Sequence, residues 1–120
     1  MVNVRDKGKR GEREFRDLVN AIFELTGDDR ISRTPCSGAL SWMKGDLVQL
    51  SGILAGFHWE VKNEKSVRIW AYIEQAENDA RQGKIPVVAF KRGGSKDFYV
   101  CLNAKYFLNL LKETEEKGVI

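Results

Sequence analysis

The segment that most constrains the fold is residues 57–62, where apolar and polar side chains alternate without a break. Its sequence reads FHWEVK, with an aromatic or branched residue at every odd position. Successive side chains of a β-strand point to opposite faces, so this strand has one apolar face and one face that carries His58, Glu60 and Lys62. The alternation therefore separates three apolar side chains from three polar ones on the two faces of one strand.

Helical and strand patterns alternate along the rest of the chain. Apolar spacing predicts helices at about 9–25 and 68–82, and Asn103 is a candidate N-cap for a third helix that runs through Leu111. The predicted strands are residues 30–33, 46–50, 57–62, 85–90 and 98–102. The residues expected on the core faces of the three helices are Phe15, Leu18, Val19, Ile22 and Phe23, then Ile69, Ile73, Ala76 and Ala80, and finally Phe107, Leu110 and Leu111. The order αβββαββα predicts an α/β (α+β) fold with a central mixed five-stranded sheet flanked by helices.

Length and composition indicate one globular domain. The chain has 120 residues, of which 42% are hydrophobic and 31% charged, so we expect a single domain over residues 1–120. No apolar run reaches the roughly 18 residues of a membrane span, and the N-terminus lacks the apolar core of a signal peptide. We therefore expect a cytoplasmic protein with no membrane partner. Two cysteines and one histidine argue against a thiolate zinc site and a disulfide framework.

The charge of the chain is unevenly distributed. The formal net charge is only +3, but residues 5–13 carry five basic side chains against two acidic ones. Such a basic arm is a candidate for contacts with the phosphates of a nucleic acid. The alternative, which charge alone favours, is a solvated face that keeps the protein soluble.

Acidic residues and a lysine form the pattern that points to chemistry. Glu60 and Lys62 share one face of a strand, about 6–7 Å apart along it, and an antiparallel pairing with the preceding strand could bring Asp46 beside Glu60. Two carboxylates held close together repel each other unless a cation lies between them. Mg²⁺ takes oxygen ligands and keeps waters free, and Mn²⁺ can substitute for it.

A lysine beside such a metal can activate the attacking water and neutralise charge on phosphate oxygens. The pattern therefore indicates metal-assisted hydrolysis of a phosphodiester, with no small-molecule cofactor. The Glu-x-Lys spacing recurs at Glu115 and Lys117 in a polar tail, so its value at Glu60 comes from the alternating strand and the upstream Asp46. The alternative is a solvated strand face.

Four motifs occur in order along the chain. They are Lys7-Gly8-x-x-x-Glu12-Arg13-Glu14-Phe15, Arg33-x-x-x-Ser37-Gly38, Asp46-Leu47-Val48 and Glu60-Val61-Lys62. Together with the later apolar segment 85–91, they resemble the archaeal Holliday junction resolvases and their phage and viral relatives in the PD-(D/E)xK nuclease superfamily. The resemblance spans residues 7–102 and implies a restriction-endonuclease-like core.

The resemblance also implies roles for individual positions. The residues that match catalytic positions are Glu12, Ser37, Asp46, Glu60 and Lys62. The metal-ligand set is Glu12, Asp46, Glu60 and Val61. The basic residues assigned to the DNA backbone are Lys7, Lys9, Arg10, Arg13 and Arg33. Gln75 lies on the helix after Glu-x-Lys, where relatives carry an active-site glutamine.

These observations lead to the expectation of a Mg²⁺-dependent, structure-selective DNA endonuclease, a Holliday junction resolvase that acts in DNA recombination and repair. Paired symmetric nicks in a four-way junction require two sites, so a homodimer is expected. A viral protein of this kind would act in the host cytoplasm. Two alternatives remain open: a related nuclease that acts on flaps, single strands or nicked duplex DNA, and a DNA-binding module without catalysis.

Overall fold

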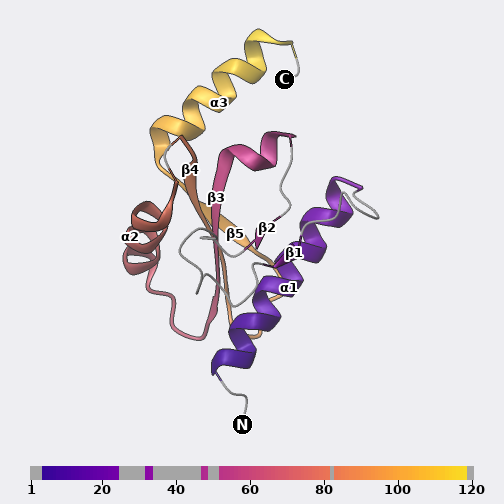
Figure 1. The fold of residues 1–120 in the computed structure, drawn as a ribbon, viewed down its shortest axis with the longest axis vertical. Coiled ribbons are helices and arrows are strands. Elements are labelled where there is room, and N and C mark those ends of the chain that lie inside the picture. Colours follow the sequence, from indigo (N-terminus) through magenta and orange to yellow (C-terminus); the bar gives the residue numbers. More distant parts are fainter. Residues whose placement is uncertain (1–3, 25–31, 34–46, 49–51, 82, 119–120) are drawn as a thin grey trace.

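A computed structural model describes residues 4–24, 32–33, 47–48, 52–81 and 83–118. Its helices and strands are α1 (Val4–Ile22), β1 (Ser32–Arg33), β2 (Leu47–Val48), the 3₁₀ helix η3 (Gly52–Gly56), β3 (Phe57–Glu64), α2 (Ile69–Asp79), β4 (Ile85–Arg92), β5 (Tyr99–Cys101) and α3 (Ala104–Glu116). Figure 1 shows a sheet in the centre, with α1 on one side and α2 on the other. The helix α3 lies at one end of the molecule.

The central sheet has the strand order β3-β4-β5. β3 and β4 are parallel, and β4 and β5 are antiparallel. Parallel neighbours need a crossover connection, and α2 supplies it on one face of the sheet. β4 lies between two partners, and its residues Val87, Val88 and Ala89 are buried, as expected for a strand covered on both faces.

The predicted five-stranded sheet is not what the described residues form. Five strands are present, but β1 and β2 pair with each other in a separate two-stranded sheet, and three strands form the central one. The described parts of β1 and β2 are two residues long, and their pairing joins Ser32 to Val48 and Arg33 to Leu47. The strand that begins at Asp46 was expected to pair with the strand of Glu60. In the described residues, β2 instead pairs with β1.

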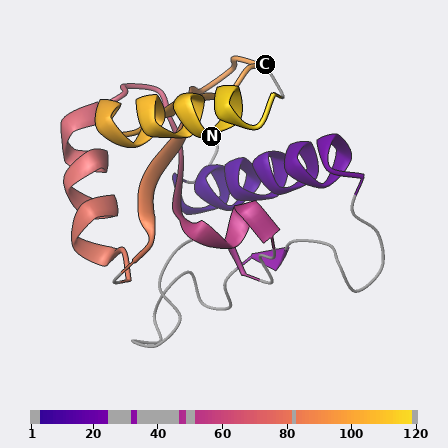
Figure 2. The same cartoon turned by 90° about the horizontal axis from the view of Figure 1, so that it is seen from above.

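The alternation predicted for β3 is confirmed. The odd positions face α1: the rings of Trp59 and Phe15 lie 5.5 Å apart between centroids, and Val61 is buried in the same cluster. The even positions face α2, where Lys62 contacts Gln75. Each face of β3 thus has its own covering helix (Figure 2).

The approach of α1 to β3 depends on a glycine. A Cβ built on Gly11 would lie 2.6 Å from the Cβ of Asn63, closer than two carbon atoms can pack. Gly11, Phe15 and Val19 are buried at intervals of four residues, which is the spacing of one helix face. The absence of a side chain at Gly11 lets the helix backbone lie directly on the strand.

Two predicted core faces are wrong in part. In α1, Leu18, Ile22 and Phe23 are exposed, because the face that contacts the sheet follows the spacing of Gly11, Phe15 and Val19. In α3, Phe107 and Leu111 are exposed and Leu110 is half-buried, and none of the helix's residues is buried. The apolar stripe of α3 is present, but in the described chain α3 lies at the end of the sheet and not on a face of it.

The remaining helix predictions agree better with the structure. Asn103 is the N-cap of α3, and its side chain accepts a hydrogen bond from the Lys105 main-chain nitrogen at 2.9 Å. In α2, Ala76 is buried and Ile69 and Ile73 are half-buried, as predicted, but the other buried residue is Tyr72. Ala80, predicted on the same face, is the C-cap. Among the described helices, none has the length and apolar character of a membrane span.

Candidate active site

The polar face of β3 carries a buried pair of side chains. His58 and Glu60 are 3% and 2% exposed, and the His58 Nε2 atom lies 2.9 Å from the Glu60 Oε1 atom. They are neighbours because residues two apart in a strand lie on the same face. Burial of a carboxylate costs free energy unless hydrogen bonds or charge compensate for it, and the imidazole provides such a contact.

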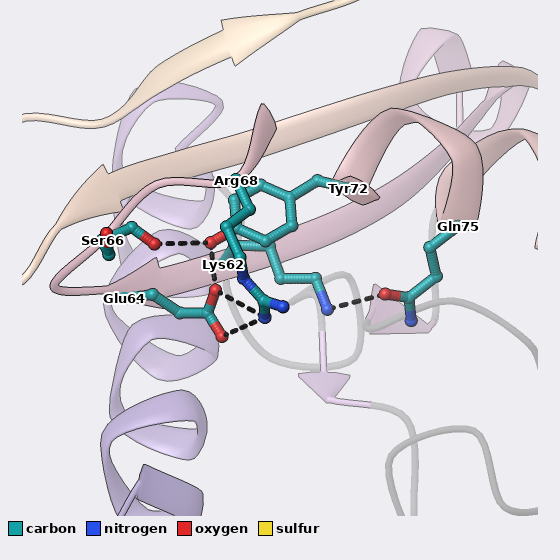
Figure 3. A network of polar contacts seen from close by, with 6 residues as sticks. All are labelled: Lys62, Glu64, Ser66, Arg68, Tyr72 and Gln75. Carbon is teal, nitrogen blue, oxygen red and sulfur yellow. Dashed lines mark hydrogen bonds and ion pairs between the residues drawn. The ribbon is translucent and has the colours of Figure 1, made fainter. Parts of the chain in front are cut away.

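Lys62 lies next on the same face, and α2 determines its position. Its Nζ donates a hydrogen bond to the Gln75 Oε1 atom at 2.8 Å and lies 5.6 Å from the centre of the Tyr72 ring (Figure 3). A cation over an aromatic ring is attracted to the negative face of the ring. Tyr72 and Gln75 are three residues apart and so share one face of α2, which explains why both reach Lys62.

Beyond Lys62, the same face ends in a second polar group. The Tyr72 hydroxyl donates a hydrogen bond to Glu64, and the Arg68 guanidinium donates to the same carboxylate at 3.3 Å. The Arg68 guanidinium also lies 5.9 Å from the centre of the Tyr72 ring, so two cations, from Lys62 and Arg68, approach one ring (Figure 3). Tyr72 therefore links the candidate catalytic lysine to the end of β3.

These contacts shift the pKa values of Glu64 and Tyr72. Burial raises the pKa of Glu64, but the hydrogen bonds from Tyr72 and Arg68 and the charge of Arg68 outweigh it, so the pKa lies below the ordinary value of 4.5. Burial and the bond to Glu64 raise the pKa of the Tyr72 hydroxyl. Glu64 is therefore an anion and Tyr72 a neutral donor at pH 7.

Glu64, Arg68 and Tyr72 are members of this polar group that were not predicted from the sequence. A signal for Glu64 was available, because the polar positions 58, 60 and 62 continue to 64. Arg68 and Tyr72 follow at intervals of four residues, which favours one helical face. What the pattern could not show is that α2 would cover this face of β3.

Glu12 belongs to the helix on the other side of β3 from Glu60. It is 8% exposed and follows Gly11 on α1, the helix that covers the odd face of β3, whereas Glu60 belongs to the even face. In the described sheet, β4 is the partner of β3 on one side. The opposite edge of β3 is therefore the place where residues from the two faces of the strand can approach each other. The structure therefore brings Glu60, Lys62 and Gln75 to one face and places Glu12 on the helix across the strand.

The structure describes some of the other predicted site residues and not others. Ser37 and Asp46 lie outside the described residues. Lys7 lies in α1 and Arg33 in β1, where the main chain is described. The remaining basic residues assigned to DNA lie on α1: Lys9 is half-buried, Arg13 is exposed, and the exposed Arg10 forms a 4.0 Å ion pair with Glu14.

The residues expected to hold a metal have the appropriate donor type. Glu60 and Glu12 offer carboxylate oxygens, and Val61 a main-chain oxygen, which are the ligands that Mg²⁺ prefers. In the part of the chain that the structure describes, no three His, Cys, Asp or Glu side chains form a group that could hold a metal ion. The donor chemistry fits a hard divalent cation, and Asp46 belongs to the same predicted set.

A comparison with protein-family models gives a match over almost the whole chain. Residues 3–119 match the family described as "Phage putative PDDEXK endonuclease". A search of curated proteins and a search of solved structures each found no match. A mixed sheet flanked by helices fits a fold of this family, with three strands in the described central sheet where five were predicted.

Proposed function

Because the chain belongs to the phage putative PDDEXK endonuclease family, we propose that it is a Mg²⁺-dependent DNA endonuclease whose substrate is a four-way (Holliday) junction. The family match supports the coarser activity, a nuclease. The observation that carries the proposed chemistry is the placement of Lys62. Its ammonium is held by Gln75 and the Tyr72 ring on the same face of β3 as the buried Glu60.

Each residue has a role in this chemistry. A water oxygen attacks the phosphorus, the bond from phosphorus to the 3′ oxygen breaks, and the products carry a 5′ phosphate and a 3′ hydroxyl. Lys62 positions or deprotonates the water and neutralises charge that develops on the phosphate oxygens. Gln75 and Tyr72 restrict the lysine to one place, and Ser37 is proposed to contribute to cleavage.

The divalent cation would be held by Glu12, Asp46, Glu60 and Val61. It would be Mg²⁺, for which Mn²⁺ could substitute. When bound, such a cation lowers the pKa of a water and neutralises phosphate charge. On the protein side, the imidazole of His58 holds one oxygen of Glu60.

Resolution of a junction requires two nicks in opposed strands. One chain carries one candidate site, so we propose a homodimer in which the two sites face the two strands. The residues Lys7, Lys9, Arg10, Arg13 and Arg33 are proposed to contact the DNA backbone. Such contacts depend on charge and not on base sequence, which suits selection by the shape of branched DNA.

The test is a cleavage assay on labelled four-way junction, flap, nicked duplex, linear duplex and single-stranded DNA. Each substrate is incubated with Mg²⁺, with Mn²⁺ and with EDTA. We expect paired nicks in the junction with either metal and no cleavage in EDTA. Equal cleavage of junction and linear duplex would contradict the junction proposal and leave the nuclease, and no cleavage of any substrate would contradict both.

Variants separate the site from general effects. Glu60→Gln and Lys62→Ala are expected to lower the cleavage rate at least about 100-fold, the lower end of what a positioned acid–base group contributes. Junction binding, measured in EDTA, is expected to persist. Lys105→Ala is the matched control, because Lys105 is an exposed lysine on α3, and its rate should equal that of the unmodified protein.

A further inference from the structure

Two parallel strands end side by side at the end of the molecule away from α3. Glu64, the last residue of β3, is the register partner of Arg92, the last residue of β4, and the Gly93 nitrogen donates to the Glu64 carbonyl at 3.1 Å. The loop at 65–68 and the turn at 93–98 therefore begin next to each other (Figure 1). Residues nearly 30 positions apart in sequence therefore lie together where β3 and β4 end.

The first half of α1 comes to the same end. Gly11 lies against Asn63, near the end of β3, and Phe15 lies against Trp59, so α1 runs antiparallel to β3. Its N-terminal turns project past the end of the strand, as Figure 1 shows. Lys91, at the end of β4, contacts Glu14 of α1 and donates to the Ser95 carbonyl at 3.1 Å, which ties the helix to the turn.

The first half of α1, the loop at 65–68 and the segment 92–98 carry exposed basic side chains. We call the surface that they form the basic end. Its members are Arg10, Lys65, Arg68, Arg92 and Lys96, all exposed. Of the described carboxylates on these segments, Glu14 contacts Lys91, Glu64 contacts Arg68, Glu12 is buried and Asp97 is exposed. Within the described chain, Lys65, Arg92 and Lys96 form no ion pair with a carboxylate, so their charge is available to a ligand.

We propose that the basic end binds the sugar–phosphate backbone of DNA next to the scissile phosphate. The inference rests on the proposed nuclease function and extends its DNA contacts to Lys65, Arg68, Arg92 and Lys96. A duplex carries one phosphate charge per about 1.7 Å of its axis, and exposed lysine and arginine side chains neutralise these charges with release of counterions.

The position of the basic end relative to the candidate site supports this assignment. Lys62 lies two residues before the end of β3, about 6–7 Å along the strand from Glu64. Lys62 and Arg68 approach the same Tyr72 ring, at 5.6 and 5.9 Å from its centre. A DNA strand whose phosphate reaches Lys62 therefore passes Arg68 and the adjoining loop.

The test compares two triple variants that remove the same charge. The first is Lys65→Gln, Arg92→Gln and Lys96→Gln. The control is Lys105→Gln, Lys112→Gln and Lys117→Gln, three exposed lysines in and just after α3 at the opposite end of the molecule. The molecule is 50 Å along its longest axis, several times the Debye length of about 8 Å at physiological ionic strength, so the two ends act separately.

Binding of the full chain to a labelled four-way junction is measured by fluorescence anisotropy in EDTA, from 50 to 300 mM KCl. Loss of three phosphate contacts should reduce the slope of log affinity against log salt by about two to three units in the first variant. The control variant should keep the slope of the unmodified protein. Melting curves of both variants, and the single variants Arg92→Gln and Lys96→Gln, separate lost contacts from lost fold.

Equal changes of slope in the two triple variants, or no change in either, would overturn the inference. Because binding is measured without divalent metal, the result does not depend on cleavage. If the unmodified protein cleaves DNA and the two triples bind alike, the nuclease function stands and the basic end is wrong. If nothing is cleaved but the first triple alone loses its salt slope, the DNA surface stands and the nuclease chemistry is wrong.

Discussion

At the scale of single residues, the buried contact between His58 and Glu60 is the feature with the clearest chemical consequence. The chain contains one histidine, and its Nε2 atom lies 2.9 Å from Glu60. Carboxylates that ligate metals are themselves oriented by hydrogen bonds, and loss of such a partner typically costs 10- to 100-fold in metal affinity. His58 is therefore expected to act as a positioning residue for Glu60.

The first prediction concerns this contact. We expect His58→Leu to weaken Mn²⁺ binding about 10- to 100-fold by isothermal titration calorimetry, because the carboxylate loses the group that orients it. His58→Gln retains a hydrogen-bond donor and should recover part of the affinity. Unchanged Mn²⁺ affinity in a folded His58→Leu protein would show that the contact is structural.

The second prediction concerns Glu64. Its pKa is lower in the folded protein than its ordinary value of 4.5, so its ion contacts stabilise the fold above that value and are lost as pH falls through the lower folded pKa. Glu64→Gln should therefore reduce the free energy of unfolding at pH 7, and the difference from the unmodified protein should shrink below about pH 4.5. Urea unfolding between pH 3 and 7 measures it. Glu74→Gln, at an exposed position of α2, is the control, and an equal pH trend there would contradict the assignment.

At the scale of elements, the packing of α1 on β3 decides where Glu12 lies. The helix lies close to the strand because Gly11 has no side chain, and Glu12 is the next residue. A helix that moved outward would carry Glu12 with it. The glycine thus links helix packing to the geometry of the candidate site.

The third prediction follows from this packing. In Gly11→Ala the new Cβ would lie 2.6 Å from the Asn63 Cβ, and overpacking costs about 1–3 kcal/mol, against a gain in helix propensity of about 1 kcal/mol. We expect a net loss of stability of up to about 2 kcal/mol in chemical denaturation, with a lower cleavage rate. Gly56→Ala is the control, since a Cβ there meets no atom within 4 Å. Equal stability of the two variants would contradict the close approach of α1.

At the scale of the whole molecule, the charged and the apolar surfaces lie at different places. The basic end lies opposite α3, while Trp70 and Tyr106 are exposed and line one pocket between α2 and the start of α3. Large apolar side chains gathered on a surface are typical of interaction sites. The proposed homodimer is expected to use this apolar surface, which leaves the basic end of each copy free for DNA.

The fourth prediction tests the homodimer directly. Light scattering should give the mass of two chains at micromolar concentration, and Trp70→Glu should give the mass of one, because a charge in an apolar interface is costly to bury. Ile22→Glu replaces an exposed apolar residue on α1 and should leave the mass at two chains. A single-chain mass for the unmodified protein would contradict paired nicking by one dimer.

Some properties of this protein follow from local sequence. The alternation at 57–62, the N-cap at Asn103 and the Glu-x-Lys motif each depend on residues close together in the chain, and the structure has β3 and the start of α3 where they predict them. The nuclease family was indicated in the same way, by short motifs in order. The junction substrate, the metal and the homodimer remain predictions.

Tertiary structure alone decided which elements meet. Periodicity reports the side chains that share one face of a helix or strand, but not the element that covers the face. The apolar stripe of α3 was therefore wrongly predicted to be core, and the contacts of Tyr72 with Lys62 and Glu64 were missed. The basic residues at 10, 65–68 and 92–96 become one surface only because parallel strands end together and α1 runs back past them.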